Sequence, residues 1–213
     1  MAGEPGDTKA EPGVRTAPPS LIHVLTSVVA PIDIAGLFPV PQPVEVELGS
    51  GDATFLLQYA RSHPERNFLG VERMLGRLRK LDRKGSRAGL TNLRGLRIEA
   101  AYLLEYLIPP ASVHTFHVYF PDPWPKRRHW PRRLVNERFT QVTSRALAPG
   151  GTVYLRTDST DYFRQMESVF AASSAFQAID TPSDLSAVLT DFERDFLAQG
   201  VRTHRAAFRK VAA

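Results

Sequence analysis

From Pro43 onward, short apolar runs of strand type alternate with amphipathic segments, and this alternation limits the possible folds more than any other feature. The apolar runs are VEVEL, NFLGVE, LRGLRI, VHTFHVYF and TVYLRT. Strands that alternate with helices pair in parallel, because each helix carries the chain back across the sheet before the next strand begins. We therefore expect an α/β fold with a parallel, doubly wound sheet.

Composition indicates where the folded region begins. Residues 1–20 are rich in Pro, Gly, Glu, Lys and Thr, which is typical of disorder, and this leaves residues 21–213 as one domain. The sequence Ala-Pro-Gly-Gly at 148–151 predicts that a helix stops there and that a strand follows directly. No apolar stretch approaches the ~20 residues that cross a bilayer, so we expect a cytoplasmic protein without membrane contacts.

Positive charge is clustered in two places along the chain. The 213 residues contain 27 Lys and Arg against 22 Asp and Glu, a net charge of only +5. The run KRRHWPRR at Lys126–Arg133 contains no acid, and a second basic stretch, Arg73–Lys84, contains only Asp82. Such clusters favour a polyanionic partner, although solvated helix faces are an alternative, more so for the second stretch.

The chain contains no cysteine, and this excludes two kinds of chemistry. Thiolate attack on a pyrimidine ring and iron–sulfur radical chemistry both need cysteine. His114 and His117 are three residues apart on an expected strand, so they point to opposite faces and predict no metal site.

A glycine-containing loop follows the first predicted strand. Gly49 and Gly51 form a G-x-G pattern, but Thr54 stands where a dinucleotide site needs a third glycine. Glu47 precedes the loop, and its carboxylate suits a cationic ligand and would repel a pyrophosphate. S-adenosylmethionine carries an ammonium and a sulfonium, so this loop predicts an S-adenosylmethionine site.

Two more acids end the next predicted strands. Glu72 lies near the ~20-residue spacing at which an acid meets ribose hydroxyls, and Glu99 closes the strand after that, where adenine would lie. Each acid alone could be an ordinary strand-end carboxylate. Together with Glu47 they mark the carboxyl edge of the sheet, where open α/β folds bind ligands. Glu45 points away from its strand neighbours and is expected to be structural.

The segment after the VHTFHVYF strand is stiffened by Pro121, Pro123 and Pro125. Proline fixes its own φ and restricts the residue before it, so we expect Asp122 and Trp124 to be extended and to face the cofactor. The alternative is a proline-rich turn whose Trp merely packs.

With these segments the chain resembles the bacterial tRNA (guanine-N7-)-methyltransferases. The matching elements are ELGSG at 47–51, GVE at 70–72, NLR at 92–94, FPDPWPK at 120–126, HWPRRL at 129–134, TDSTDY at 157–162 and TDFE at 190–193. The resemblance covers nearly everything from about Ile32 to the last strand. It implies the class I S-adenosylmethionine-dependent methyltransferase fold, which is Rossmann-like and doubly wound, with a mostly parallel sheet of about seven strands.

The resemblance also assigns roles. The activity would be methyl transfer from S-adenosylmethionine to N7 of a guanosine in the variable loop of tRNA. The implied cofactor-binding residues are Glu47, Gly49, Gly51, Glu72, Glu99 and Asp122; the implied substrate-binding residues are Lys126, Asp158, Thr190, Asp191, Phe192 and Glu193. Apart from the resemblance, the basic run itself predicts contacts of the tRNA backbone with Arg127, Arg128, Arg132 and Arg133. The family usually has Asp at position 99 and often Lys or Arg at position 191, where this chain has Glu99 and Asp191.

The chemistry of guanine N7 supports this family independently of the resemblance. Guanine N7 has a lone pair and no proton, so no general base is needed and catalysis rests on placement. Asp122 is the expected catalytic residue, supported by Asp158, because both would accept hydrogen bonds from guanine and stabilise the positive charge that develops on it. A monomer and a homodimer both suit the sequence.

Three alternatives stay open at this point. An amino-methyltransferase acting on adenine N6 has a similar loop, but Asp122-Pro123-Trp124 lacks its second consecutive proline. A small-molecule methyltransferase would leave KRRHWPRR without a purpose. A catalytically silent fold that only binds RNA would not need its cofactor acids.

Overall fold

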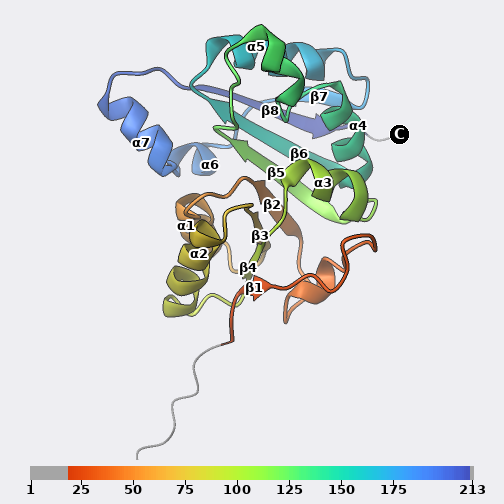
Figure 1. Ribbon diagram of the computed structural model, residues 1–213, viewed down its shortest axis with the longest axis vertical. Coiled ribbons are helices and arrows are strands. Elements are labelled where there is room, and N and C mark those ends of the chain that lie inside the picture. The colour runs from red at the N-terminus through yellow and green to blue at the C-terminus, as the bar shows by residue number, and fades with distance from the viewer. Residues whose placement is uncertain (1–18, 212–213) are drawn as a thin grey trace, which may run out of the picture.

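The computed structural model describes residues 19–211, so the predicted leader lies almost entirely outside the described residues (Figure 1). The described chain forms an eight-stranded sheet of order β1-β4-β3-β2-β5-β6-β8-β7. Its strands are β1 (Ile22–His23), β2 (Val44–Leu48), β3 (Asn67–Val71), β4 (Leu93–Leu96), β5 (Val113–Tyr119), β6 (Leu147–Thr157), β7 (Phe176–Ile179) and β8 (His204–Lys210).

The strand order reverses between β2 and β5. From β2 the chain proceeds through β3 and β4 toward one edge, and from β5 it proceeds through β6 toward the other. Neighbouring strands pair in parallel except at β8, which is antiparallel to both β6 and β7. This is the doubly wound, mostly parallel sheet that was predicted, with its topological switch point at β2 and β5.

Helices cover both faces of this sheet (Figure 1). They are α1 (Thr54–Ser62), α2 (Leu75–Arg87), α3 (Ala100–Tyr102), α4 (Glu137–Ala146), α5 (Thr160–Ala171), α6 (Ser183–Ala187) and α7 (Asp191–Ala198). Short 3-10 turns span Ala35–Leu37 and Arg127–Arg132, and a π-helical turn spans Leu103–Leu107. No helix in the described part of the chain is long and apolar enough to cross a membrane.

Two buried clusters hold the layers together. One lies under α4 and α5 and includes Phe139 and Phe170. The other lies under α1 and α2 and includes Phe55 and Leu81. At Gly70 in β3 an added Cβ would lie 2.8 Å from Leu81, so this glycine allows α2 to approach the sheet closely.

Two strand boundaries differ from the prediction. β6 begins at Leu147 and includes the Ala-Pro-Gly-Gly sequence, which was expected to precede the strand. The register against β5 shifts between Val113 and Thr115, and Gly150 adopts a φ of 72°, so the extra residues are absorbed by an irregularity within the strand. β4 ends at Leu96, before the predicted end of the LRGLRI run.

Candidate active site

The carboxyl edge of the sheet gathers the predicted acids. Glu47 lies on β2 and Glu72 directly follows β3, whereas Glu99, Asp122 and Asp158 follow β4, β5 and β6. These strands are neighbours in the sheet, so the acids form a row across the switch point. Ligands of doubly wound folds bind at this edge.

The loop after β2 depends on its glycines. Gly49 and Gly51 have φ values of 84° and 53°, which disfavour side chains. The backbone N–H groups of Gly49 and Ser50 both donate to the carbonyl of Val71 at 2.9 Å. The loop is thereby fastened across the end of β3, in the position that G-x-G predicted for a ligand-binding turn.

Glu72 fixes the far side of this loop. Its Oε2 accepts a hydrogen bond from the N–H of Gly51 at 3.0 Å, and its Oε1 accepts one from the N–H of Met74 at 2.7 Å. A carboxylate oxygen can accept more than one hydrogen bond, so both remain able to receive a ribose hydroxyl. The ribose contact stays a prediction, and the structure adds a role in shaping the loop.

Glu47 is the most unusual acid in the row. Its side chain is buried, and its Oε2 has no hydrogen-bond partner among residues 19–211. Burial raises the pKa of the Glu47 carboxyl well above its ordinary value; the charge of Arg156 opposes this rise, and that of Glu72 adds to it. The hydroxyl of neighbouring Ser50 is buried and unpartnered as well. Orphaned acceptors of this kind fit a ligand that brings cationic and donor groups, as S-adenosylmethionine does.

Glu99 differs from Glu47 and Glu72 in its exposure to solvent. Its side chain is exposed and caps α3, where Oε2 accepts the N–H of Tyr102 at 2.7 Å. The predicted contact with adenine stays a prediction.

The proline-rich segment differs from its prediction in one respect. Trp124 was expected to be extended, but its φ is 43°, in the left-handed region. Since proline at 125 disfavours the right-handed helical conformation for the preceding residue, the turn is made in the left-handed region instead. The Trp124 ring packs under Arg132, whose guanidinium carbon is 5.1 Å from the ring centroid, while Asp122 is exposed.

The basic run forms the 3-10 turn Arg127–Arg132 and its flanks. Four predicted tRNA-contacting cations are exposed: Lys126, Arg127, Arg128 and Arg132. Arg133 is only 1% exposed and donates to the carbonyl of Pro123 and to the side chains of Gln165 and Asp161, each at 2.7 Å. The prediction that Arg133 contacts a tRNA phosphate is therefore wrong, because its guanidinium is already used to fasten the proline-rich segment to α5.

The TDFE segment, residues 190–193, lies at the start of α7. Thr190 and Glu193 are buried, whereas Asp191 and Phe192 are exposed. The Thr190 hydroxyl accepts the N–H of Glu193 at 3.0 Å, which caps the helix. Glu193 is 0% exposed, so the prediction that its side chain contacts substrate is wrong. The capping bond uses the Thr190 hydroxyl only as an acceptor, and the predicted substrate contact of Thr190 stays a prediction. Asp191 and Phe192 are exposed, and their substrate contacts stay predictions.

Arg156 is the residue that sequence reasoning missed. Its guanidinium is buried and donates to Glu193 at 2.8 Å and to the carbonyls of Val188 and Leu185 at 2.7 and 2.6 Å. It also lies 4.3 Å from the ring centroid of Tyr119 on β5. The only available signal was an arginine inside the otherwise uncharged run TVYLRT.

A second buried network shows why Glu45 is structural. Glu45 Oε2 is hydrogen-bonded to His117 Nε2 at 2.7 Å, and Glu45 Oε1 accepts a hydrogen bond from Arg66 at 2.8 Å. His117 is buried, whereas His114 is exposed, and no group of three potential metal ligands occurs among residues 19–211.

Comparisons with known proteins agree with this geometry. A family model described as "Putative methyltransferase" matches residues 41–206. A tRNA (guanine-N(7)-)-methyltransferase of Syntrophotalea carbinolica is 36% identical, covering 84% of this chain and 78% of its own length. One of Halorhodospira halophila is 34% identical, with coverages of 84% and 79%.

Solved structures confirm the fold. A 16S rRNA methyltransferase, KamB, superimposes with a TM-score of 0.61 at 16% identity, covering 80% of this chain and 89% of its own. TrmN from Thermus thermophilus gives a TM-score of 0.57 at 18% identity and covers 80% of this chain and 45% of its own. With the matched relatives and the acid row at the switch point, the chain belongs to the tRNA (guanine-N(7)-)-methyltransferase family.

Proposed function

We propose that this chain is a methyltransferase that uses S-adenosylmethionine to methylate N7 of a guanosine in the variable loop of tRNA. The observation that carries the site is the buried, unpartnered oxygen of Glu47 at the carboxyl edge of β2. An exposed basic segment follows the neighbouring strand β5, so an acid suited to a cationic ligand and cations suited to a polyanion lie at the ends of adjacent strands.

The residues of the β2 edge would hold the cofactor. Glu47 and Ser50 offer the orphaned acceptor atoms, and Glu72 offers oxygens fixed by the backbone of the glycine loop. When bound, S-adenosylmethionine supplies an electrophilic methyl group. Glu47 suits its cationic groups, and Glu72 suits its ribose hydroxyls.

Asp122 and Asp158 would hold the guanine. Both follow strands beside the switch point, so both can accept hydrogen bonds from the N–H groups of the base. Their negative charge would also stabilise the positive charge that develops on the purine. Since N7 needs no general base, alignment supplies most of the acceleration, up to ~7–11 kcal/mol.

The exposed cations Lys126, Arg127, Arg128 and Arg132 would contact tRNA phosphates near the target nucleotide. We also propose a cytoplasmic location, since the proposed substrate is a tRNA, and a monomer or a homodimer as the oligomeric state.

Mass spectrometry of nucleosides from unmodified tRNA, incubated with protein and S-adenosylmethionine, tests this function. We expect 7-methylguanosine from the wild type and a strongly reduced yield from Asp122→Ala, with tRNA affinity largely kept. The formation of N6-methyladenosine would overturn the proposal. Binding of both ligands without any methylated nucleoside would indicate a silent RNA-binding fold.

A further inference from the structure

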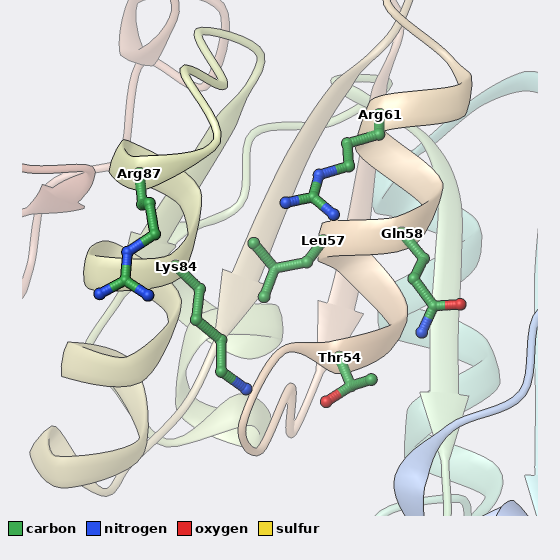
Figure 2. A pocket seen from close by; sticks show the side chains of 6 residues that line it. All are labelled: Thr54, Leu57, Gln58, Arg61, Lys84 and Arg87. Carbon is green, nitrogen blue, oxygen red and sulfur yellow. The ribbon is translucent and has the colours of Figure 1, made fainter.

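A basic groove runs between α1 and α2, away from the exposed cations of the 126–132 segment. It has a volume of about 340 Å³ and is lined by Thr54, Leu57, Gln58, Arg61, Lys84 and Arg87. Figure 2 shows Arg61 reaching from α1 toward α2, while Lys84 and Arg87 stand on the opposite wall with Leu57 between the helices.

The three cations of the groove have no acidic partners among the residues that the structure describes. Arg61, Lys84 and Arg87 are exposed, and none forms an ion pair with any residue in the described part of the chain. The 13-residue helix α2 carries six cations and one acid, Asp82. The carboxylate of Asp82 is occupied, because it accepts the N–H of Leu21 at 2.7 Å.

This charge pattern destabilises α2 as an isolated helix. Lys80 and Lys84 are four residues apart, as are Arg83 and Arg87, and like charges at this spacing repel. Lys80 forms an ion pair with Asp52 at 2.8 Å, which offsets this repulsion, whereas the groove cations have no acidic partner among the described residues. A surface that concentrates unpaired cations on facing helices is suited to phosphate groups, which arginine binds in bidentate fashion.

The groove leads from the active-site edge. Thr54 lines one end, and its hydroxyl is hydrogen-bonded to Asp191 at the start of α7. Thr54 also begins the helix that follows the glycine loop. Because an α-helix rises 1.5 Å per residue, Arg61 lies about 10 Å farther from this edge than Thr54. A nucleic-acid backbone passing the site could therefore continue along the groove.

We infer that this groove binds backbone phosphates of the substrate tRNA at a distance from the target guanosine. The inference rests on the proposed function and extends its tRNA-contacting surface to Arg61, Lys84 and Arg87. The groove is lined by cations on both walls, so it would recognise phosphodiesters without regard to base sequence.

A salt series of tRNA affinities tests this inference. The variants are Arg61→Gln, Lys84→Gln and Arg87→Gln, singly and combined, with Lys84→Arg as the charge-preserving rescue. Arg209→Gln is the matched control, because Arg209 is an exposed arginine on β8, which lies between β6 and β7 and away from α1 and α2 in the sheet order. We expect each neutralised groove residue to lower the log–log salt slope by about 0.7–0.9, while Lys84→Arg and the control keep the wild-type slope.

Kinetics on the same proteins separate this inference from the proposed function. The groove variants should raise KM for tRNA more than they lower kcat, with 7-methylguanosine still the product. Slopes equal to that of Arg209→Gln would overturn the groove as a phosphate site even if 7-methylguanosine forms. Weaker binding of inorganic phosphate by the groove variants, with no change in their tRNA salt slopes, would assign the groove to free phosphate and would also overturn the inference.

Discussion

Glu47 and Glu193 are both buried carboxylates near Arg156, but their surroundings differ. Glu193 is bonded by Arg156 at 2.8 Å and by Arg205 through two nitrogens, at 2.6 and 3.0 Å. Glu47 has an oxygen with no partner, and the charge of Arg156 reaches it without a hydrogen bond. A buried carboxylate with every oxygen paired indicates structural support, whereas one with an unpartnered oxygen indicates a place for a ligand.

Removing Glu193 should produce the largest effect. Glu193→Ala leaves Arg156 buried without its acid, so we expect the free energy of unfolding to fall by about 3–5 kcal/mol. Denaturant titration measures this loss. Glu193→Gln, which keeps the side-chain volume, should lose part of that amount and provides a soluble variant if Glu193→Ala does not fold. A free energy within about 0.5 kcal/mol of wild type for Glu193→Gln would mean that the pairing is not structural.

Glu72→Ala should act mainly on the cofactor. We expect S-adenosylmethionine binding to weaken by about 1.5–3 kcal/mol, because charge-assisted hydrogen bonds to the ribose are lost. The N–H groups of Gly51 and Met74 also lose their acceptor, so a smaller loss of stability should accompany it. Calorimetric titration gives the affinity. Wild-type affinity in a folded variant would place the ribose elsewhere.

Glu47→Gln should raise the free energy of unfolding of the ligand-free protein, whereas Glu193→Gln should lower it. The folded-state pKa of Glu47 is raised above the ordinary value of 4.5. The stability that the protonated Glu47 carboxyl contributes is therefore fully present below pH 4.5 and is lost as the pH rises through the folded-state pKa. The variant removes this loss, so the ligand-free protein should gain about 1–3 kcal/mol at pH 8 and almost nothing near pH 4.5.

Unfolding titrations at several pH values, with and without S-adenosylmethionine, measure this gain. The gain should disappear when the cofactor is present, since the variant binds it more weakly. A Glu47→Gln protein that is less stable than wild type at pH 8 would mean that the Glu47 carboxylate has a partner.

Arg132 and Arg133 make the same comparison between an unpaired and a paired group, here for cations. The expected change, in the salt slope of tRNA binding, is the smallest of those predicted. Arg132→Ala should lower the salt slope of tRNA binding by about 0.7–0.9, because one phosphate contact is lost. Arg133→Ala should leave the slope unchanged and reduce stability, since Arg133 is buried and each of its three guanidinium nitrogens donates a hydrogen bond within the protein. Equal slopes for Arg132→Ala and wild type would make this segment a solvated surface.

The parts predicted from sequence depend on local patterns. Alternating apolar runs fixed the order of strands and helices, and the acids at strand ends then fell on one edge because parallel strands end together. Residues 133, 156 and 193 could not be placed this way. Arg133 bonds to Asp161, and Arg156 bonds to Glu193, across 28 and 37 residues of chain, so their burial depends on how distant elements pack.

The same limit explains the two basic stretches. Both show only as clusters of Lys and Arg in the sequence, but one folds into an exposed 3-10 turn and the other into a helix that forms a groove wall. Which cations are unpaired follows from acids supplied by other elements, such as Asp52 for Lys80.

The most direct test of N7 methylation uses a tRNA transcript made with 7-deazaguanosine in place of guanosine. Labelled methyl transfer from S-adenosylmethionine is measured for this transcript and for its guanosine counterpart, after gel retardation has shown that both bind. We predict transfer to the guanosine transcript alone, because only that transcript has the N7 lone pair. Equal incorporation of label into the 7-deazaguanosine transcript would contradict methylation at guanine N7.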